Sequence, residues 1–259
     1  MNIHYKLGVM QMHKKLINSR KFYQIVTCAI VATGIVASSS IASATQRPTS
    51  KSKDSLVVVA PIEPVSMNPI KQANSFGNFW QPVLEPLVVL DSNFKITKQG
   101  LVIGWKQTVP GTWRLILRSG IKFTNGEKWD AKALAFTLTS YRDTVGAPMR
   151  SYLTKLTSTR VISPTVLDVV FSAADSSIPS VLSSIRALPP VYYAQVGHDG
   201  FGLKPIGTGP YKFSNWSRGV ALNLVRNNGY WGDKAKIKNL KFVFATDANL
   251  RASLLSTGG

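Results

Sequence analysis

The chain has 259 residues, of which 44% are hydrophobic and 17% are charged, and its 19 glycines and 14 prolines are too few for a collagen or low-complexity chain. Lysine and arginine outnumber aspartate and glutamate by 31 to 12, a formal charge of +19 that permits an anionic partner without specifying a fold. The single cysteine excludes a disulfide framework, and three histidines argue against a histidine-rich metal or catalytic centre.

The first 44 residues have the pattern of an export signal. They carry five basic residues and no acidic one, then an apolar run at 25–37, then small residues that end in Ala-Ser-Ala. This order predicts a Sec-type signal peptide over residues 1–44, cleaved between Ala44 and Thr45. Serines at 38–40 end the apolar run too early for a membrane anchor. The exported chain would keep 26 basic and 12 acidic residues, no cysteine and one histidine, His198.

After this segment, residues 45–54 are polar and aperiodic, which predicts a disordered leader. Short β-branched or alternating runs then predict strands at 56–60, 87–90, 112–118, 160–163, 167–171, 211–216, 220–226 and 236–244. Helices are predicted at 79–84, at 131–141 after the N-cap residue Asp130, at 178–185, and at 248–254 after Asp247. The residues expected in the core are Leu56 to Val59, Leu115, Leu117, Leu134, Phe171 and Leu240. Because strands outnumber helices and most neighbours are joined as hairpins, the fold class is α+β or mixed α/β.

The sequence offers few groups for catalysis. His198 lies in the stretch 196–200, which is typical of a solvated turn, and no G-x-S-x-G nucleophile motif accompanies it. The chain also has no H-E-x-x-H, no C-x-x-C and no phosphate-binding loop, since Pro210 ends the sequence Gly-Thr-Gly-Pro. Lysines 234, 236 and 238 alternate as on a solvated strand face and lack interleaved aromatic residues. We therefore predict a protein that is not an enzyme, with no cofactor, no metal and no nucleic-acid partner.

Six segments occur in an order that points to one known family: residues 63–69, 84–91, 100–105, 113–126, 205–213 and 226–232. The most specific, residues 113–126, reads W-R-L-I-L-R-S-G-I-K-F-T-N-G. It resembles the signature Y-T-F-x-L-R-x-G-V-K-F-x-D-G of the peptide/nickel-type (family 5) solute-binding proteins of bacterial ABC importers. Asn68, Pro86, Asn125 and Ala133 depart from the residues usual in that family.

The resemblance implies a fold and its extent. It implies that residues 55–259 form the first lobe of a fold like that of the type II periplasmic binding proteins, as an incomplete family 5 domain without its second lobe. Such proteins bind by closing two lobes over a ligand. We therefore expect this chain, as a truncated form, to aggregate readily and to bind peptides weakly if at all.

The resemblance also implies ligand-binding residues. It places two segments at the ligand cleft, one with Asn74, Ser75 and Phe76 and one with Met149, Arg150 and Tyr152. Arg150 and Tyr152 would offer charge and hydrogen bonds to a peptide-like or anionic ligand, and Met149 an adaptable apolar contact. Tyr211 and Tyr230, at strand ends and turns, are further candidates.

Two functions remain open at this point. The first is a periplasmic or extracellular binding protein that delivers a solute, such as an oligopeptide or dipeptide, to an ABC permease in the inner membrane, with no membrane span of its own after signal cleavage. The alternative is an exported cationic surface protein that binds an anionic polymer and has lost transport through truncation. Polymer binding would weaken steeply with ionic strength, whereas binding of a peptide in a cleft would not.

Overall fold

The computed structural model describes residues 54–71 and 77–257, which all belong to one compact unit, Pro48–Gly259. The predicted signal peptide, most of the predicted leader, and Asn74, Ser75 and Phe76 lie outside the described residues. Two four-stranded sheets organise this unit, together with a two-stranded ribbon of β2 (Val89–Leu90) and β3 (Ile96–Thr97).

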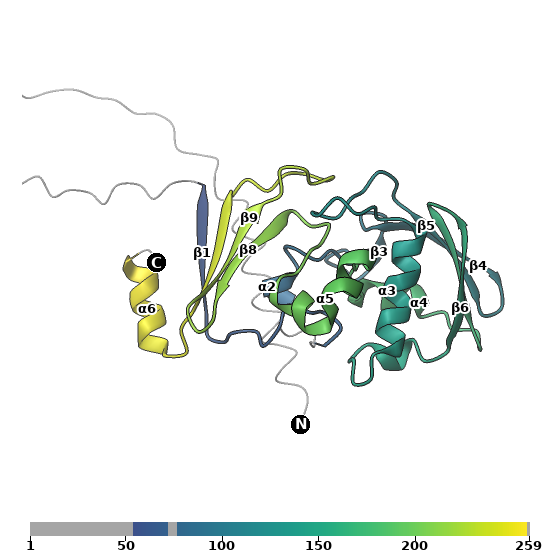
Figure 1. Ribbon diagram of the computed structural model, residues 1–259, viewed down its shortest axis with the longest axis horizontal. Coiled ribbons are helices and arrows are strands. Elements are labelled where there is room, and N and C mark those ends of the chain that lie inside the picture. Colours follow the sequence, from purple (N-terminus) through teal and green to yellow (C-terminus); the bar gives the residue numbers. More distant parts are fainter. Residues whose placement is uncertain (1–53, 72–76, 258–259) are drawn as a thin grey trace, which may run out of the picture. The chain divides into compact units, whose positions relative to one another are not determined.

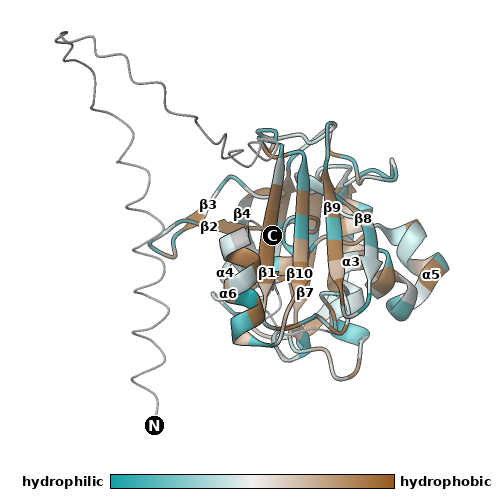
Figure 2. Ribbon diagram, turned by 90° about the vertical axis from the view of Figure 1, so that its left-hand side faces the viewer, coloured by the Kyte–Doolittle hydropathy of each residue, from teal (hydrophilic) through white to brown (hydrophobic). Residues whose placement is uncertain are grey.

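The first sheet, sheet A, joins segments from opposite ends of the described chain. Its strand order is β1 (Ser55–Ala60), β10 (Asn239–Phe244), β9 (Ala221–Arg226) and β8 (Tyr211–Ser217). Strand β1 is parallel to β10, with Ser55 opposite Asn239, and the other pairs are antiparallel. Figure 2 shows these strands side by side, with hydrophobic and hydrophilic residues mixed along β10 and β9. Strands β1 and β8 are therefore the two edges of this sheet.

The second sheet, sheet B, is entirely antiparallel. Its order is β4 (Val102–Val109), β5 (Thr112–Leu117), β7 (Val166–Phe171) and β6 (Leu156–Ser163). Helix α3 (Ala131–Asp143) packs on this sheet against β6 and β7, as Figure 1 shows. Leu115 and Leu117 of β5 and Leu134 and Leu138 of α3 belong to one core, which also includes Leu240 and Phe242 of sheet A.

The remaining helices connect or cover the sheets. They are α2 (Gly77–Trp80), η3 (Arg150–Tyr152), α4 (Ile178–Val181), η4 (Leu182–Ser184), α5 (Pro190–Leu203) and α6 (Ala248–Thr257). Helix α6 contacts β1 of sheet A. Its N-terminus is capped as predicted, because the carboxylate of Asp247 accepts a 2.7 Å hydrogen bond from the backbone N–H of Leu250.

A buried carboxylate links three strands of sheet B. Asp168 lies in the central strand β7 and is only 1% exposed, directly opposite Arg114 in β5 and Arg160 in β6. Its two carboxylate oxygens accept two hydrogen bonds from Arg114, at 2.7 and 2.9 Å, and one from Arg160, at 3.0 Å. These arginines, Arg114 first, hold the pKa of Asp168 at about 2, below its ordinary value of 3.8. The cross-strand pairing thus offsets the cost of burying the charge.

The structure confirms the mixed class and most of the predicted strands, and it corrects several details. The strand β4 and the helix α5 were missed, as were the short elements β3 and η3. Leu56, predicted to be in the core, is 47% exposed because β1 is an edge strand. Strand β10 begins at Asn239, so lysines 234, 236 and 238 are exposed but precede the strand instead of sharing its face.

Candidate functional site

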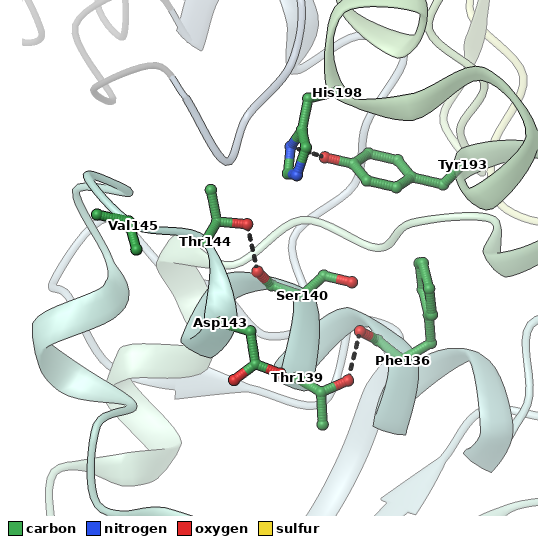
Figure 3. Close-up of a pocket in the computed structure, with 8 residues that line it drawn as sticks. All are labelled: Phe136, Thr139, Ser140, Asp143, Thr144, Val145, Tyr193 and His198. Atoms are coloured by element: carbon green, nitrogen blue, oxygen red, sulfur yellow. Dashed lines mark hydrogen bonds between the residues drawn. The ribbon is translucent and has the colours of Figure 1, made fainter.

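The structure contains a pocket between α3 and α5. It has a volume of about 530 Å³, within the range of small-molecule sites. Figure 3 shows the side chains that line it: Phe136, Thr139, Ser140, Asp143, Thr144, Val145, Tyr193 and His198. Val145 is 87% exposed, so the pocket opens to solvent at this residue. The lining combines hydroxyl groups, aromatic rings and an imidazole.

Helix α3 supplies one wall of the pocket. One face of this helix packs into the core, and another face lines the pocket. Asp130 caps the helix by accepting hydrogen bonds of 2.9 and 3.0 Å from the N–H groups of Lys132 and Ala133. The first of these faces, which includes the predicted core residue Leu134 and also Leu138, is buried in the core. Residues 136, 139, 140, 143 and 144 recur at helical spacing on another face and line the pocket.

Helix α5 supplies the opposite wall and is broken in the middle. Gly197 has φ 67° and ψ −174°, a combination that interrupts the helix and that glycine adopts without steric cost. Tyr193, before the break, is buried, and His198, just after it, is half-buried. The ring of Tyr193 meets Phe136 and His198 edge-on, with centroid distances of 5.9 and 5.4 Å. The prediction of a solvated turn around His198 was therefore wrong, because this stretch belongs to α5, which is interrupted at Gly197.

A hydrogen-bond chain supports the imidazole from behind. Asn68, which is 0% exposed, donates from Nδ2 to the hydroxyl of Tyr193 and to the carbonyl oxygen of His198, both at 2.9 Å. The Tyr193 hydroxyl lies 2.8 Å from Nδ1 of His198. Burial raises the pKa of Tyr193 to about 12, and burial together with Lys71 lowers the pKa of His198. At neutral pH the tyrosine therefore keeps its proton and the imidazole is neutral.

Charged side chains on the pocket elements and on the segments beside them form ion pairs and hydrogen bonds. Lys71 pairs with Asp199 at 2.9 Å, and Arg142 pairs with Asp143 at 2.6 Å. Arg150 donates from Nε to the backbone oxygen of Arg142 at 3.0 Å, which ties η3 to the last turn of α3. Of these charged residues, Asp143 is the one that lines the pocket.

Comparison with known proteins identifies the family of this chain. The family model described as bacterial extracellular solute-binding proteins, family 5 Middle, matches residues 98–259. The chain belongs to this family. The resemblance found in the sequence is confirmed.

Relatives of this family differ in what they bind. The nickel-binding periplasmic protein of Escherichia coli (strain K12) is 30% identical over 183 residues, which cover 68% of this chain and 34% of the relative. The glutathione-binding protein GsiB of Salmonella paratyphi A is 28% identical over 174 residues, covering 65% of this chain and 34% of the relative. The chain thus spans about a third of the length of these curated relatives.

A solved structure supports the fold. The oligopeptide-binding protein AppA of Bacillus subtilis, in complex with a nonapeptide, superposes with a TM-score of 0.72 at 23% identity. The match covers 79% of this chain and 42% of AppA. It therefore supports the expectation of a partial fold of the family 5 type.

The residues predicted as ligand-binding fall into separate groups. Met149 precedes η3 and packs partly on the core, while Arg150 and Tyr152, in η3, are exposed. The segment contacts α3, where Arg150 donates to the backbone oxygen of Arg142. Tyr211 lies elsewhere, in β8, and donates from its hydroxyl to the backbone oxygen of Ile237 at 3.1 Å. None of the five predicted residues that the structure describes is among those that line the pocket, so their contact with a ligand stays a prediction.

Tyr230 belongs to a buried network that joins three of the family motifs. Its hydroxyl donates to one carboxylate oxygen of Glu85 at 2.6 Å, and the indole N–H of Trp231 donates to the other at 2.8 Å. The guanidinium of Arg118 lies 4.6 Å from the centre of the Trp231 ring. Burial raises the pKa of Glu85, although both donors oppose the shift. The network fixes the relative positions of these motifs, and it uses the Tyr230 hydroxyl in an internal hydrogen bond.

None of the lining residues was predicted from the sequence as part of a ligand site. Phe136 was predicted only as part of the helix at 131–141, and Asn68, which supports Tyr193 and His198, was noted only as a departure from the family pattern. The adjacent prolines 189 and 190 were the available signal for α5, since proline is favoured in the first turn of a helix. Among the described residues, no helix has the length and apolar character needed to cross a membrane. Within the same residues, no cluster of three or more metal-binding side chains occurs.

Proposed function

We propose that this protein is the substrate-binding component of an ABC importer and that it captures a solute, most simply an oligopeptide, without changing it chemically. Membership of family 5 over residues 98–259 carries this proposal. Capture would take place in the periplasm, after removal of the signal peptide between Ala44 and Thr45, and the solute would pass to an ABC permease in the inner membrane. Asn74, Ser75, Phe76 and the η3 residues would contact it.

The pocket between α3 and α5 supports this role by its chemistry. Its ring of Phe136 and its hydroxyl and imidazole groups offer both an apolar surface and neutral hydrogen-bonding partners, a combination that suits peptides. The ligands named for relatives include a nonapeptide and nickel, so peptide and metal complexes are the substrates to compare. The pocket opens to solvent at Val145. A solute bound in this pocket would therefore be contacted by the protein on one side only.

The test is a titration of the full chain, followed by NMR, with trialanine, glutathione and a nickel(II)–histidine mixture. We expect trialanine to shift signals of the pocket residues with a dissociation constant on the order of 1 mM, about −4 kcal/mol, because the contact is one-sided. Ser140→Ala should weaken this binding about two- to tenfold, the effect of one lost hydrogen bond. The matched control is Ser158→Ala, on the exposed face of β6, which should bind as the unchanged chain does.

Other results would point elsewhere. A shift confined to the nickel mixture would replace the peptide with a metal complex. Binding of heparin that falls steeply with salt, without shifts in the pocket, would favour the anionic-polymer alternative. No shift with any of the three probes would refute the proposed function.

A further inference from the structure

His198 offers a hydrogen-bonding group whose direction is fixed by its neighbours. The argument begins at Asn68, whose amide orientation is set from two sides. The backbone N–H of Ile70 donates to Oδ1 of Asn68 at 3.0 Å, and the carbonyl oxygen of His198 can only accept. Nδ2 of Asn68 must therefore be the atom that faces His198 and Tyr193.

The orientation of Asn68 determines the role of the tyrosine. Nδ2 of Asn68 donates to the Tyr193 oxygen, so this oxygen is an acceptor there. The hydroxyl has one proton of its own, and the raised pKa of Tyr193 keeps it in place. Within the described residues, the one acceptor that remains for this proton is Nδ1 of His198, at 2.8 Å.

The tyrosine in turn determines the tautomer of the imidazole. A neutral imidazole carries a single proton, and a nitrogen that accepts a hydrogen bond leaves it on the other nitrogen. With Nδ1 accepting from Tyr193, the proton is on Nε2. Figure 3 shows this second nitrogen turned away from Tyr193, toward Thr144 and Ser140. In the part of the chain that the structure describes, Nε2 has no hydrogen-bond partner.

We propose that His198, held as the Nε2–H tautomer by Tyr193 and Asn68, is a ligand-binding donor of this pocket and that it takes an acceptor oxygen of the solute, a carboxylate or a peptide carbonyl. The hydroxyl of Ser140 points into the same space and provides a second donor (Figure 3). This inference rests on the proposed function, and it assigns His198 the role of a hydrogen-bond donor to the solute.

The tautomer is measured first, on the free protein. Two-dimensional ¹⁵N NMR of the imidazole distinguishes a protonated nitrogen from an accepting one, and the signals missing from a His198→Leu variant identify His198 among the three histidines of the full chain. We expect a protonated Nε2 and an accepting Nδ1 near neutral pH. Tyr193→Phe should shift this signature toward a mixture of tautomers. The matched control is Tyr192→Phe, because Tyr192 donates to the backbone oxygen of Lys204 and does not line the pocket.

Binding is measured next, with trialanine as the probe. His198→Leu should weaken binding about two- to tenfold, and Tyr193→Phe should weaken it in the same direction. His198→Gln, whose amide nitrogen reaches a position close to Nε2, should recover part of the affinity lost in His198→Leu. Trialanine amide separates the two oxygen types: weaker binding of the amide indicates the carboxylate, and equal binding indicates a carbonyl.

Two results overturn the inference alone. One is a free protein in which Nδ1 carries the proton, and the other is a His198→Leu variant that binds trialanine as tightly as the unchanged chain. Absence of trialanine binding in the unchanged chain has a different meaning, since it refutes peptide capture and the assignment of His198 together.

Discussion

Replacing the buried carboxylate of sheet B should lower stability by an amount that follows from its pKa. The pKa of Asp168 falls from 3.8 in the unfolded chain to about 2 in the folded one. At about 1.4 kcal/mol per pKa unit, this shift corresponds to about 2.5 kcal/mol of stability at neutral pH. Asp168 is 1% exposed, but the side chains of Arg114 and Arg160 are 33% and 71% exposed, so solvent screens part of this attraction. Asp168→Asn should therefore reduce the free energy of unfolding by about 2 kcal/mol at pH 7.

The pH dependence gives the sharper test. A carboxylate with a lowered pKa stabilises the folded state above the unfolded pKa and loses this effect as the pH falls through the folded value. The difference between the unchanged chain and Asp168→Asn should thus be full at pH 5 and shrink between about pH 4 and pH 2. Urea unfolding curves, recorded by circular dichroism across this range, measure it.

A second carboxylate provides the control. Asp143 also pairs with an arginine, at 2.6 Å, but it is 61% exposed, so Asp143→Asn should cost less than about 1 kcal/mol. If Asp168→Asn proved as mild as Asp143→Asn, or if its effect did not change with pH, the account of Asp168 as a paired, desolvated charge would be refuted.

Three further predictions concern other parts of the chain. Glu85→Gln should cost about 1–3 kcal/mol in urea unfolding, because an amide offers one acceptor oxygen where two donors are bound. Gly207→Ala should cost about 1–3 kcal/mol, since its new methyl group would overlap the carbonyl oxygen of Val83; Gly229→Ala, whose methyl group meets an atom only at 3.6 Å, is its control. Mass spectrometry of the exported protein should give Thr45 as the first residue, and a chain that retains its first 44 residues would contradict the signal-peptide prediction.

Sequence reasoning succeeded where structure is local. The hairpins β6–β7 and β8–β9 and the capped helix α3 were predicted because turn residues, alternation and Asp130 lie within a few positions of one another. Strand β4 was missed because its outer half is polar and exposed, so it lacks a clear apolar alternation. Helix α5 was missed because its glycines have low helix propensity and tertiary contacts with Asn68 and Phe136 hold it in place.

The site was harder to predict than the fold for the same reason. Asn68 and Tyr193 are separated by 125 positions, and no local pattern reports that they meet. The resemblance did direct attention to Met149, Arg150 and Tyr152, in a segment that contacts α3, but their contact with a solute stays a prediction. Tyr211 and Tyr230 were predicted to bind a ligand because they are aromatic residues at strand ends and turns. Their hydroxyl groups instead make internal hydrogen bonds. Nothing in the local sequence distinguishes these two roles.

The parallel pairing of β1 with β10 has a consequence for the order in which the chain folds. Ser55 and Asn239 are 184 positions apart, and closing a loop of that length costs about 4–5 kcal/mol of chain entropy before the pair gains any contact. The hairpins of both sheets close much shorter loops, so we expect them to form early and β1 to join β10 late. During synthesis, Ser55–Ala60 must wait until nearly all of the described chain has been made. Until then this uncharged, β-branched segment is unpaired, and the speed of its docking governs how long it stays available to other chains.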